Sequence, residues 1–181
     1  MKRTKIIGLL IVLLTIATLA IPVMAYRNKH QNPSSPLTTQ EIYWLTYMRE
    51  EEKLARDVYT KLFELYGLRV FENIMASEQN HMNAIKNMLD KYSLPDPAAG
   101  NGIGVFTNDY IQTLYETLFA KGKLSVIDAL EVGVIIEETD IADLKDALAV
   151  TTHTDVDNVY ANLLQGSYNH LSAFEYNLSR Y

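Results

Sequence analysis

The chain has 181 residues, of which 48% are hydrophobic and 21% are charged, and its formal net charge is −6. A chain of this composition can bury the core of one compact domain, which excludes an intrinsically disordered protein. The acidic balance argues against nucleic acid as a partner, and the lack of cysteine excludes disulfides, thiolate ligands and cysteine nucleophiles.

The N-terminal residues differ in composition from the rest of the chain. Residues 1–5 carry three cationic side chains, and an apolar run over residues 6–23 follows them. Val23 and Ala25 stand at the offsets that signal peptidase requires, so cleavage after Ala25 is expected; the run is also long enough to be a membrane anchor. Either alternative for residues 1–25 predicts an exported, extracytoplasmic domain, with membrane contact only through an uncleaved segment.

A polar linker over residues 26–37 precedes one helical domain over residues 38–181. Thr38 and Glu41 form the pattern of a capping box, which predicts a helix over residues 39–66 that Gly67 ends. A second helix is expected over residues 70–92. Its inner stripe repeats at spacings of three and four, as the seam of a helical bundle does, and consists of Phe71, Ile74, Glu78, His81, Ile85 and Met88.

The remaining elements follow a long connection rich in proline and glycine. A short helix is expected over residues 107–121, and Ser125 caps a long helix that reaches about residue 150. The last helix is expected from residue 154 to the end. Short links predict two antiparallel hairpins, and the connection between them is long enough to cross a bundle. The sequence therefore predicts an all-α, ferritin-like four-helix bundle whose crossover contains a short extra helix.

Acidic and imidazole side chains stand on the inner stripes of all four long helices. Such groups are rarely buried unless they are paired or bind a metal, and facing helices that offer carboxylates and imidazoles describe a dinuclear metal site. Iron and manganese accept this mixed ligation, so two iron ions are expected, with manganese as the alternative. The predicted ligands are Glu52, Glu78, His81, Glu137, Asp140 and His170.

Several neighbouring residues leave alternatives open. Glu50, Glu51 and Glu138 each stand close to a predicted ligand, and clusters of glutamate on helices are usually solvated. A shift of one residue in the seam would nevertheless exchange Glu52 for Glu51, or Glu137 for Glu138. Tyr59 and Tyr160 lie on the seams as packed side chains, or as hydrogen-bond donors and electron relays near the metals.

Four segments of the sequence resemble a known group of proteins. Glu52 stands seven residues before a tyrosine, and Glu78 and His81 form Glu-x-x-His; both features are similar to ferritins and rubrerythrins. The segments YMREEEKLARD, SEQNHM, IEETDI and SYNHL look more closely like a prokaryotic ferritin-like domain family of unknown function. The resemblance extends over about residues 37–176. It implies a ferritin-like fold and a diiron centre.

One position departs from the usual diiron pattern. Ser167 stands three residues before His170, where a second Glu-x-x-His would have a glutamate. Asp140 then either replaces the missing carboxylate or accepts a hydrogen bond from a ligand.

Two functions of different classes are compatible with these features. The resemblance implies redox chemistry of Fe(II) with dioxygen or hydrogen peroxide, of the ferroxidase or peroxidase type. The alternative is a non-catalytic metal-binding or structural bundle at the cell envelope. A monomer or dimer is expected rather than a cage, because of the tethered N-terminus and the extra crossover helix.

Overall fold

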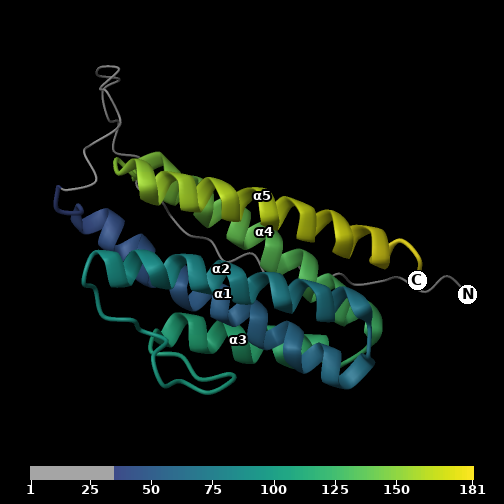
Figure 1. Ribbon diagram of the computed structural model, residues 1–181. Coiled ribbons are helices and arrows are strands. Elements are labelled where there is room, and N and C mark those ends of the chain that lie inside the picture. Colours follow the sequence, from purple (N-terminus) through teal and green to yellow (C-terminus); the bar gives the residue numbers. More distant parts are fainter. Residues whose placement is uncertain (1–34) are drawn as a thin grey trace, which may run out of the picture.

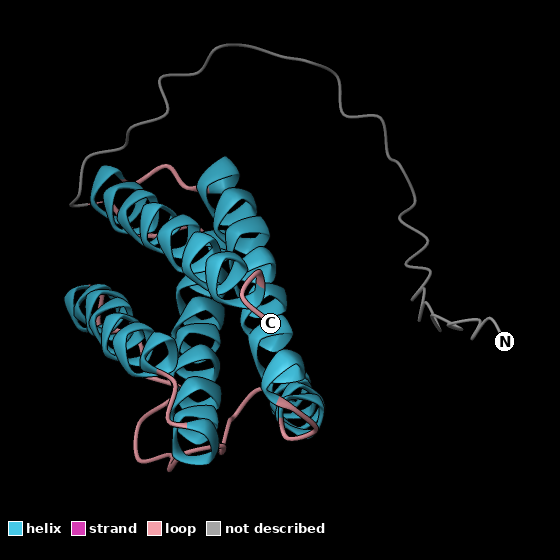
Figure 2. Cartoon of the chain, turned by 90° about the vertical axis from the view of Figure 1, so that its right-hand side faces the viewer, coloured by secondary structure: helices cyan, strands magenta, loops and turns pink. Residues whose placement is uncertain are grey.

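The computed structural model describes residues 35–181, in which all regular structure is helical (Figures 1 and 2). The all-α prediction is confirmed for this part of the chain. Five helices follow one another: α1 (Thr39–Tyr66), α2 (Arg69–Lys91), α3 (Asp109–Gly122), α4 (Val126–Val150) and α5 (Thr154–Leu178).

Local capping explains where several helices begin and end. The Thr38 side chain accepts a hydrogen bond from the Glu41 amide, and the Glu41 carboxylate accepts one from the Thr38 amide, so the predicted capping box is present. Gly67 ends α1 in the left-handed region with φ 65°, where glycine carries no steric penalty. Asn108 caps α3, which therefore starts two residues later than predicted.

The end of the chain differs from the prediction. The last helix, α5, ends at Leu178 instead of continuing to residue 181, and a turn follows it. The amides of Ser179 and Arg180 still bond to carbonyls of the last helical turn. No apolar side chain of these last residues reaches the core, so nothing extends the helix further.

The helices pack as two pairs. The most extensive contacts join α1 to α2 and α4 to α5, and the short links within each pair make both of them hairpins (Figure 1). The third helix lies in the connection between the hairpins and packs on both α1 and α4. Smaller contacts join α1 to α4 and α2 to α5, so the two hairpins enclose a common interior.

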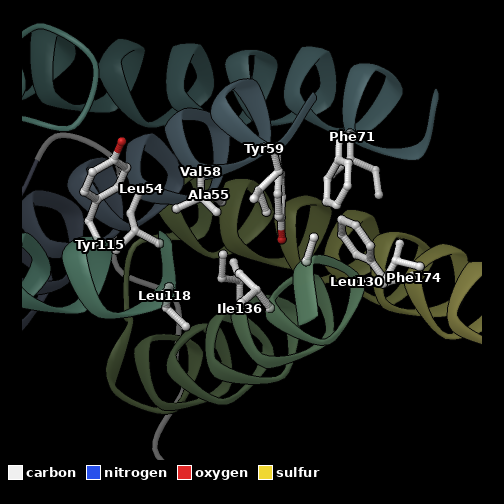
Figure 3. Close-up of a cluster of buried hydrophobic side chains, with 14 of the residues drawn as sticks. Leu54, Ala55, Val58, Tyr59, Phe71, Tyr115, Leu118, Leu130, Ile136 and Phe174 are labelled. Carbon is white, nitrogen blue, oxygen red and sulfur yellow. The ribbon is translucent and has the colours of Figure 1, made fainter. Parts of the chain in front are cut away.

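Two clusters of buried apolar side chains fill this interior at different levels along the helices. One contains Tyr59, Phe71, Leu130 and Phe174, and Figure 3 shows Tyr59 reaching from α1 toward α4. The other contains Leu45, Ile85, Leu144 and Leu163, among others. Each fully buried large side chain contributes roughly 1.5–3 kcal/mol. On every long helix, a stretch without buried apolar cluster residues separates the two clusters, near residues 52, 78, 140 and 167.

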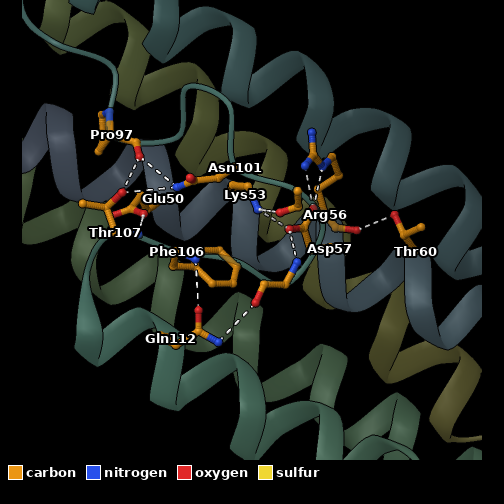
Figure 4. A network of polar contacts seen from close by, with 12 residues as sticks. Glu50, Lys53, Arg56, Asp57, Thr60, Pro97, Asn101, Phe106, Thr107 and Gln112 are labelled. Atoms are coloured by element: carbon orange, nitrogen blue, oxygen red, sulfur yellow. Dashed lines mark hydrogen bonds and ion pairs between the residues drawn. The ribbon is translucent and has the colours of Figure 1, made fainter.

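The connection between α2 and α3, residues 92–108, is fastened to α1 by buried polar groups, shown in Figure 4. Glu50 accepts hydrogen bonds from the amides of Thr107 and Asn108, at 2.5 and 3.0 Å. Lys53 Nζ lies 2.5 Å from Asp57 Oδ2 and donates to the Gly102 carbonyl. Glu50 is therefore buried and not solvated as expected.

Further ion pairs complete this arrangement. Asp96 in the connection pairs with Arg49 at 2.9 Å, and Arg56 pairs with Asp57 at 2.6 Å. We call the six charged residues of this site the strap cluster: Arg49, Glu50, Lys53, Arg56, Asp57 and Asp96.

The predicted signal or anchor segment and most of the linker lie outside the described residues, so both stay predictions. His30 also lies outside them. Between residues 35 and 181, no helix is both long enough and apolar enough to cross a membrane.

Candidate metal centre

The six predicted ligands come from four helices and lie in the layer between the two apolar clusters. We call them the central cluster: Glu52, Glu78, His81, Glu137, Asp140 and His170. Five of them are buried, and the side chain of His81 is 12% exposed. Apolar side chains above and below this layer keep water from it, which strengthens every electrostatic interaction inside.

Glu78 lies between the two histidines of the central cluster. Its Oε2 is 2.8 Å from His81 Nδ1, and its Oε1 is 2.8 Å from His170 Nδ1. Glu52 Oε2 approaches His81 Nδ1 from α1 at 3.1 Å. Glu78, His81 and His170 each offer a ligand atom within 4.8 Å of the others. A carboxylate whose two oxygens face two different imidazoles is placed as a bridging ligand has to be.

Glu137 joins the cluster from α4. Its Oε2 lies 3.5 Å from His170 Nδ1, and its Oε1 accepts a hydrogen bond of 2.7 Å from the Tyr59 hydroxyl. Tyr59 is fully buried, and its ring packs against Phe174 at a centroid distance of 5.0 Å. The packed ring fixes the hydroxyl, so Tyr59 orients the Glu137 carboxylate.

The Ser167 side chain forms a hydrogen bond with Asp140. Ser167 stands where the diiron pattern has a glutamate, and Asp140 is the residue that could replace this carboxylate. The Ser167 hydroxyl lies 2.5 Å from Asp140 Oδ2 and also 2.9 Å from the Leu163 carbonyl. Asp140 Oδ1 is buried without a hydrogen-bond partner. Asp140 therefore has one oxygen held by α5 and one oxygen free for a ligand.

Three ligand atoms of the central cluster lack a hydrogen bond. They are Glu52 Oε1, Asp140 Oδ1 and His170 Nδ1, and all three are inaccessible to solvent. His170 Nδ1 lies close to Glu78, but it is not aligned with it as a hydrogen bond requires. A buried polar atom left unpaired costs about 1–3 kcal/mol, so Glu52 Oε1 and Asp140 Oδ1 are the two atoms of this layer that could accept a further partner.

The pKa values in the central cluster follow from its excess of negative charge. Burial, together with the charge of Asp140, raises the pKa of Glu52 well above its usual value, and burial with the charge of Glu78 raises that of Glu137. Burial opposes the charge of His81, but Glu52 and Glu78 raise its pKa to about 11. Glu137 and Glu78 likewise raise the pKa of His170 to about 9 against the effect of burial. The two histidines of the cluster therefore retain their protons at neutral pH.

Two further residues shape the site, and sequence reasoning did not single them out. Ser77 Oγ lies 2.9 Å from His170 Nε2, which directs the Nδ1 of that ring into the cluster. Gly166 lies against the His81 ring: a Cβ at this position would stand 2.6 Å from His81 Nε2. The sequence contained a signal for each of them: Ser77 stands next to the predicted ligand Glu78, and Gly166 is a glycine inside a predicted helix.

The alternates take different positions. Glu138 is exposed, which favours Glu137 as the inward residue of that pair. Glu51 is as buried as Glu52 but lies toward Asp140 and Asp143. Tyr160 packs in the apolar cluster with Leu45, and none of the bonds described above reaches it.

The remaining histidine, His153, is fully buried at the start of α5. Its Nδ1 lies 2.9 Å from Glu41 Oε1, and its Nε2 lies 2.9 Å from Ser35 Oγ. It fastens the segment before α1 to the link between α4 and α5, apart from the central cluster.

Comparison with known proteins places the chain in a family. Residues 41–180 match the family described as "Uncharacterized protein domain (DUF2202)". The chain belongs to this family. The uncharacterized protein MJ0754 of Methanocaldococcus jannaschii is 48% identical over 149 residues, which cover 82% of this chain and 80% of that protein.

Solved structures agree with the helical architecture. The crystal structure of hypothetical protein MJ0754 superposes with a TM-score of 0.81 at 47% identity, over 83% of this chain and 86% of that chain. A DUF305 fragment from Deinococcus radiodurans superposes with a TM-score of 0.66 at 18% identity, over 81% of this chain and all of that one. The second likeness concerns the fold alone.

Proposed function

We propose that this DUF2202 protein binds two iron ions in the central cluster and oxidises Fe(II) with dioxygen or hydrogen peroxide. The observation that carries the proposal is the pair of buried carboxylate oxygens without a partner, Glu52 Oε1 and Asp140 Oδ1, beside the two imidazoles in one water-excluded layer. Carboxylate oxygens and imidazole nitrogens are the donors that iron and manganese accept at +2.

The donor set fits two ions. Glu52, Glu78 and His81 would hold one ion, and Glu137 and His170 the other. Glu78 has its two oxygens directed at different histidines, as a bridge requires. Asp140 would contribute its free oxygen. When bound, the ions would supply the Fe(II)/Fe(III) couple, while the protein fixes the ligands and excludes water.

The order of the elements supports a ferritin-like four-helix bundle. Two helical hairpins, joined by a crossover that contains α3, bring α1, α2, α4 and α5 around one interior. In bundles of this class the metal ligands project inward from all four long helices. The central cluster likewise draws its residues from all four long helices, although α5 supplies His170 without a glutamate and α4 supplies two carboxylates.

The proposal is tested by metal analysis of the purified protein, followed by anaerobic addition of Fe(II) and exposure to oxygen under an absorption spectrometer. About two irons per chain are expected, with a near-ultraviolet band that grows on oxidation. His81→Ala should reduce the bound metal, because it removes an imidazole between two carboxylates. Glu138→Gln is the matched control, since it neutralises an exposed glutamate beside Glu137.

A wild-type protein that binds no metal would overturn the proposal. Tightly bound metal without oxidation would instead support the second candidate function, a non-catalytic metal-binding bundle. The bond between Ser167 and Asp140 favours this second candidate, because it commits one oxygen of a predicted ligand to the protein.

A further inference from the structure

Glu51 is a buried carboxylate that the central cluster does not use. Only 3% of the residue is exposed. Glu51 Oε2 has no hydrogen-bond partner and is inaccessible to solvent. Within residues 35–181, no ion pair joins Glu51 to a lysine, arginine or histidine. A charged group in this position needs a cation, and none of residues 35–181 supplies one.

Asp143 connects Glu51 to the surface. The two carboxyl groups lie within hydrogen-bonding reach of each other, and the Tyr47 hydroxyl is within reach of Asp143 on its other side. Asp143 is half-buried, one helical turn along α4 from the buried Asp140, and Asp146 lies a further turn out and is exposed. Carboxylates therefore lead in order from the surface of α4 through Asp143 and Glu51 toward Asp140.

A small cavity lies beside Glu51, and Asp143 does not line it. Glu51 lines a cavity of about 10 Å³ together with Thr139 and the apolar side chains Leu54, Leu114, Leu118 and Ile136. A cavity of this size has room for about one water molecule. The oxygens of Glu51 and Asp143 are hard ligands of the kind that divalent cations select.

We propose that Glu51 and Asp143 form a third cation site, through which divalent metal ions reach the dinuclear centre. This inference rests on the proposed function, because it needs a centre to be loaded. The charge of Asp140 acts on Glu51, so an ion held between these carboxylates would lie near a residue of the central cluster. Negative charge along a low-dielectric path raises the local concentration of cations and the rate at which they arrive.

The test is the rate at which Co(II) loads the protein, followed by stopped-flow absorption without oxygen, together with the final stoichiometry. Glu51→Gln and Asp143→Asn keep the shape of each side chain and remove its charge. Each should slow loading at least about tenfold while the final spectrum and the number of tightly bound ions stay unchanged. Glu138→Gln removes an exposed charge from the same helix and should load at the wild-type rate.

The outcomes separate the two proposals. Unchanged loading rates in both Glu51→Gln and Asp143→Asn would overturn the third site and leave the dinuclear centre intact. A loss of tightly bound Co(II) in Glu51→Gln would also overturn it, because Glu51 would then be a ligand of the centre itself. A wild-type protein that takes up no Co(II) would overturn both proposals.

Discussion

Two buried polar clusters lie on different sides of α1, and they differ in how their charges are balanced. In the strap cluster, three cations face three carboxylates, and the remaining oxygens accept backbone amides. In the central cluster, four carboxylates face only two imidazoles, and three ligand atoms have no hydrogen bond. Both clusters are buried within the same helical domain.

The comparison separates buried charges that are balanced within residues 35–181 from buried charges that are not. A buried ion pair with all its oxygens bonded is complete without any other molecule, as at Asp57, which bonds Lys53, Arg56 and the Gly104 amide. A cluster with excess negative charge destabilises the protein unless a cation binds. Opposite responses to the loss of a charge are therefore expected from the two clusters.

Among the substitutions, the largest effect on stability is expected from Asp57→Ala in the strap cluster. The change leaves the fully buried Lys53 without its carboxylate partner, so the free energy of unfolding should fall by about 3–5 kcal/mol. Urea unfolding measures it. Asp90→Ala, which removes an exposed ion pair with Lys86, is the control and should stay within about 0.5 kcal/mol. A small effect of Asp57→Ala would mean that Lys53 finds another partner.

The metal-free protein should lose stability between pH 6.5 and pH 9. His81 and His170 have pKa values raised to about 11 and about 9, so the folded state keeps protons that the unfolded chain has released above pH 6.5. This stabilisation is complete below the unfolded pKa and is lost as the pH rises toward the folded values, by about 3 kcal/mol for each histidine in this range.

Urea unfolding at the two pH values, with a chelator present, checks this prediction. The strap cluster should not contribute, because Arg49 holds the pKa of Asp96 below its usual value against the effect of burial, and Asp96 stays ionised throughout. Stability that does not change between pH 6.5 and pH 9 would show that the central histidines do not retain their protons.

Neutralising one carboxylate of the central cluster should stabilise the metal-free protein. Glu137→Gln keeps an oxygen that can accept from Tyr59 and removes one excess charge, so the free energy of unfolding should rise by about 1 kcal/mol. Metal affinity should fall in the same variant. Urea unfolding with a chelator and a Co(II) titration measure the two effects. A loss of both stability and metal affinity would mean that other groups of the protein already balance the negative charge of Glu137.

The smallest change in stability is expected from Gly166→Ala. The new Cβ would displace the His81 ring, yet helix propensity favours alanine, so stability should change by less than about 1 kcal/mol. Metal affinity should fall by about tenfold or more. Gly133→Ala is the contrasting variant, because its Cβ would meet the Phe174 ring at 2.4 Å in an apolar cluster, so its main effect should be a loss of stability. Unchanged affinity in Gly166→Ala would contradict this role.

The sequence predicted the helices well because the signals for them are local. The capping box of Thr38 and Glu41, the glycine at position 67 and the spacing of three and four along α2 depend only on neighbouring residues. The same spacing placed Glu78 and His81 on one face, where the structure brings them together. The end of α5 was wrong because no local signal stops the helix before residue 181.

By itself, the sequence determined the helical fold and the residues that face the interior, since the helical repeat orients side chains without reference to other elements. Only the tertiary structure decided the roles of Glu50, Glu51 and Glu52. Consecutive residues on a helix point about 100° apart, so one seam cannot bury all three. They are buried because α1 is covered on several sides: by the connection between α2 and α3, by α4 and by α2. The balance of charge around each glutamate then depends on residues that are distant in sequence.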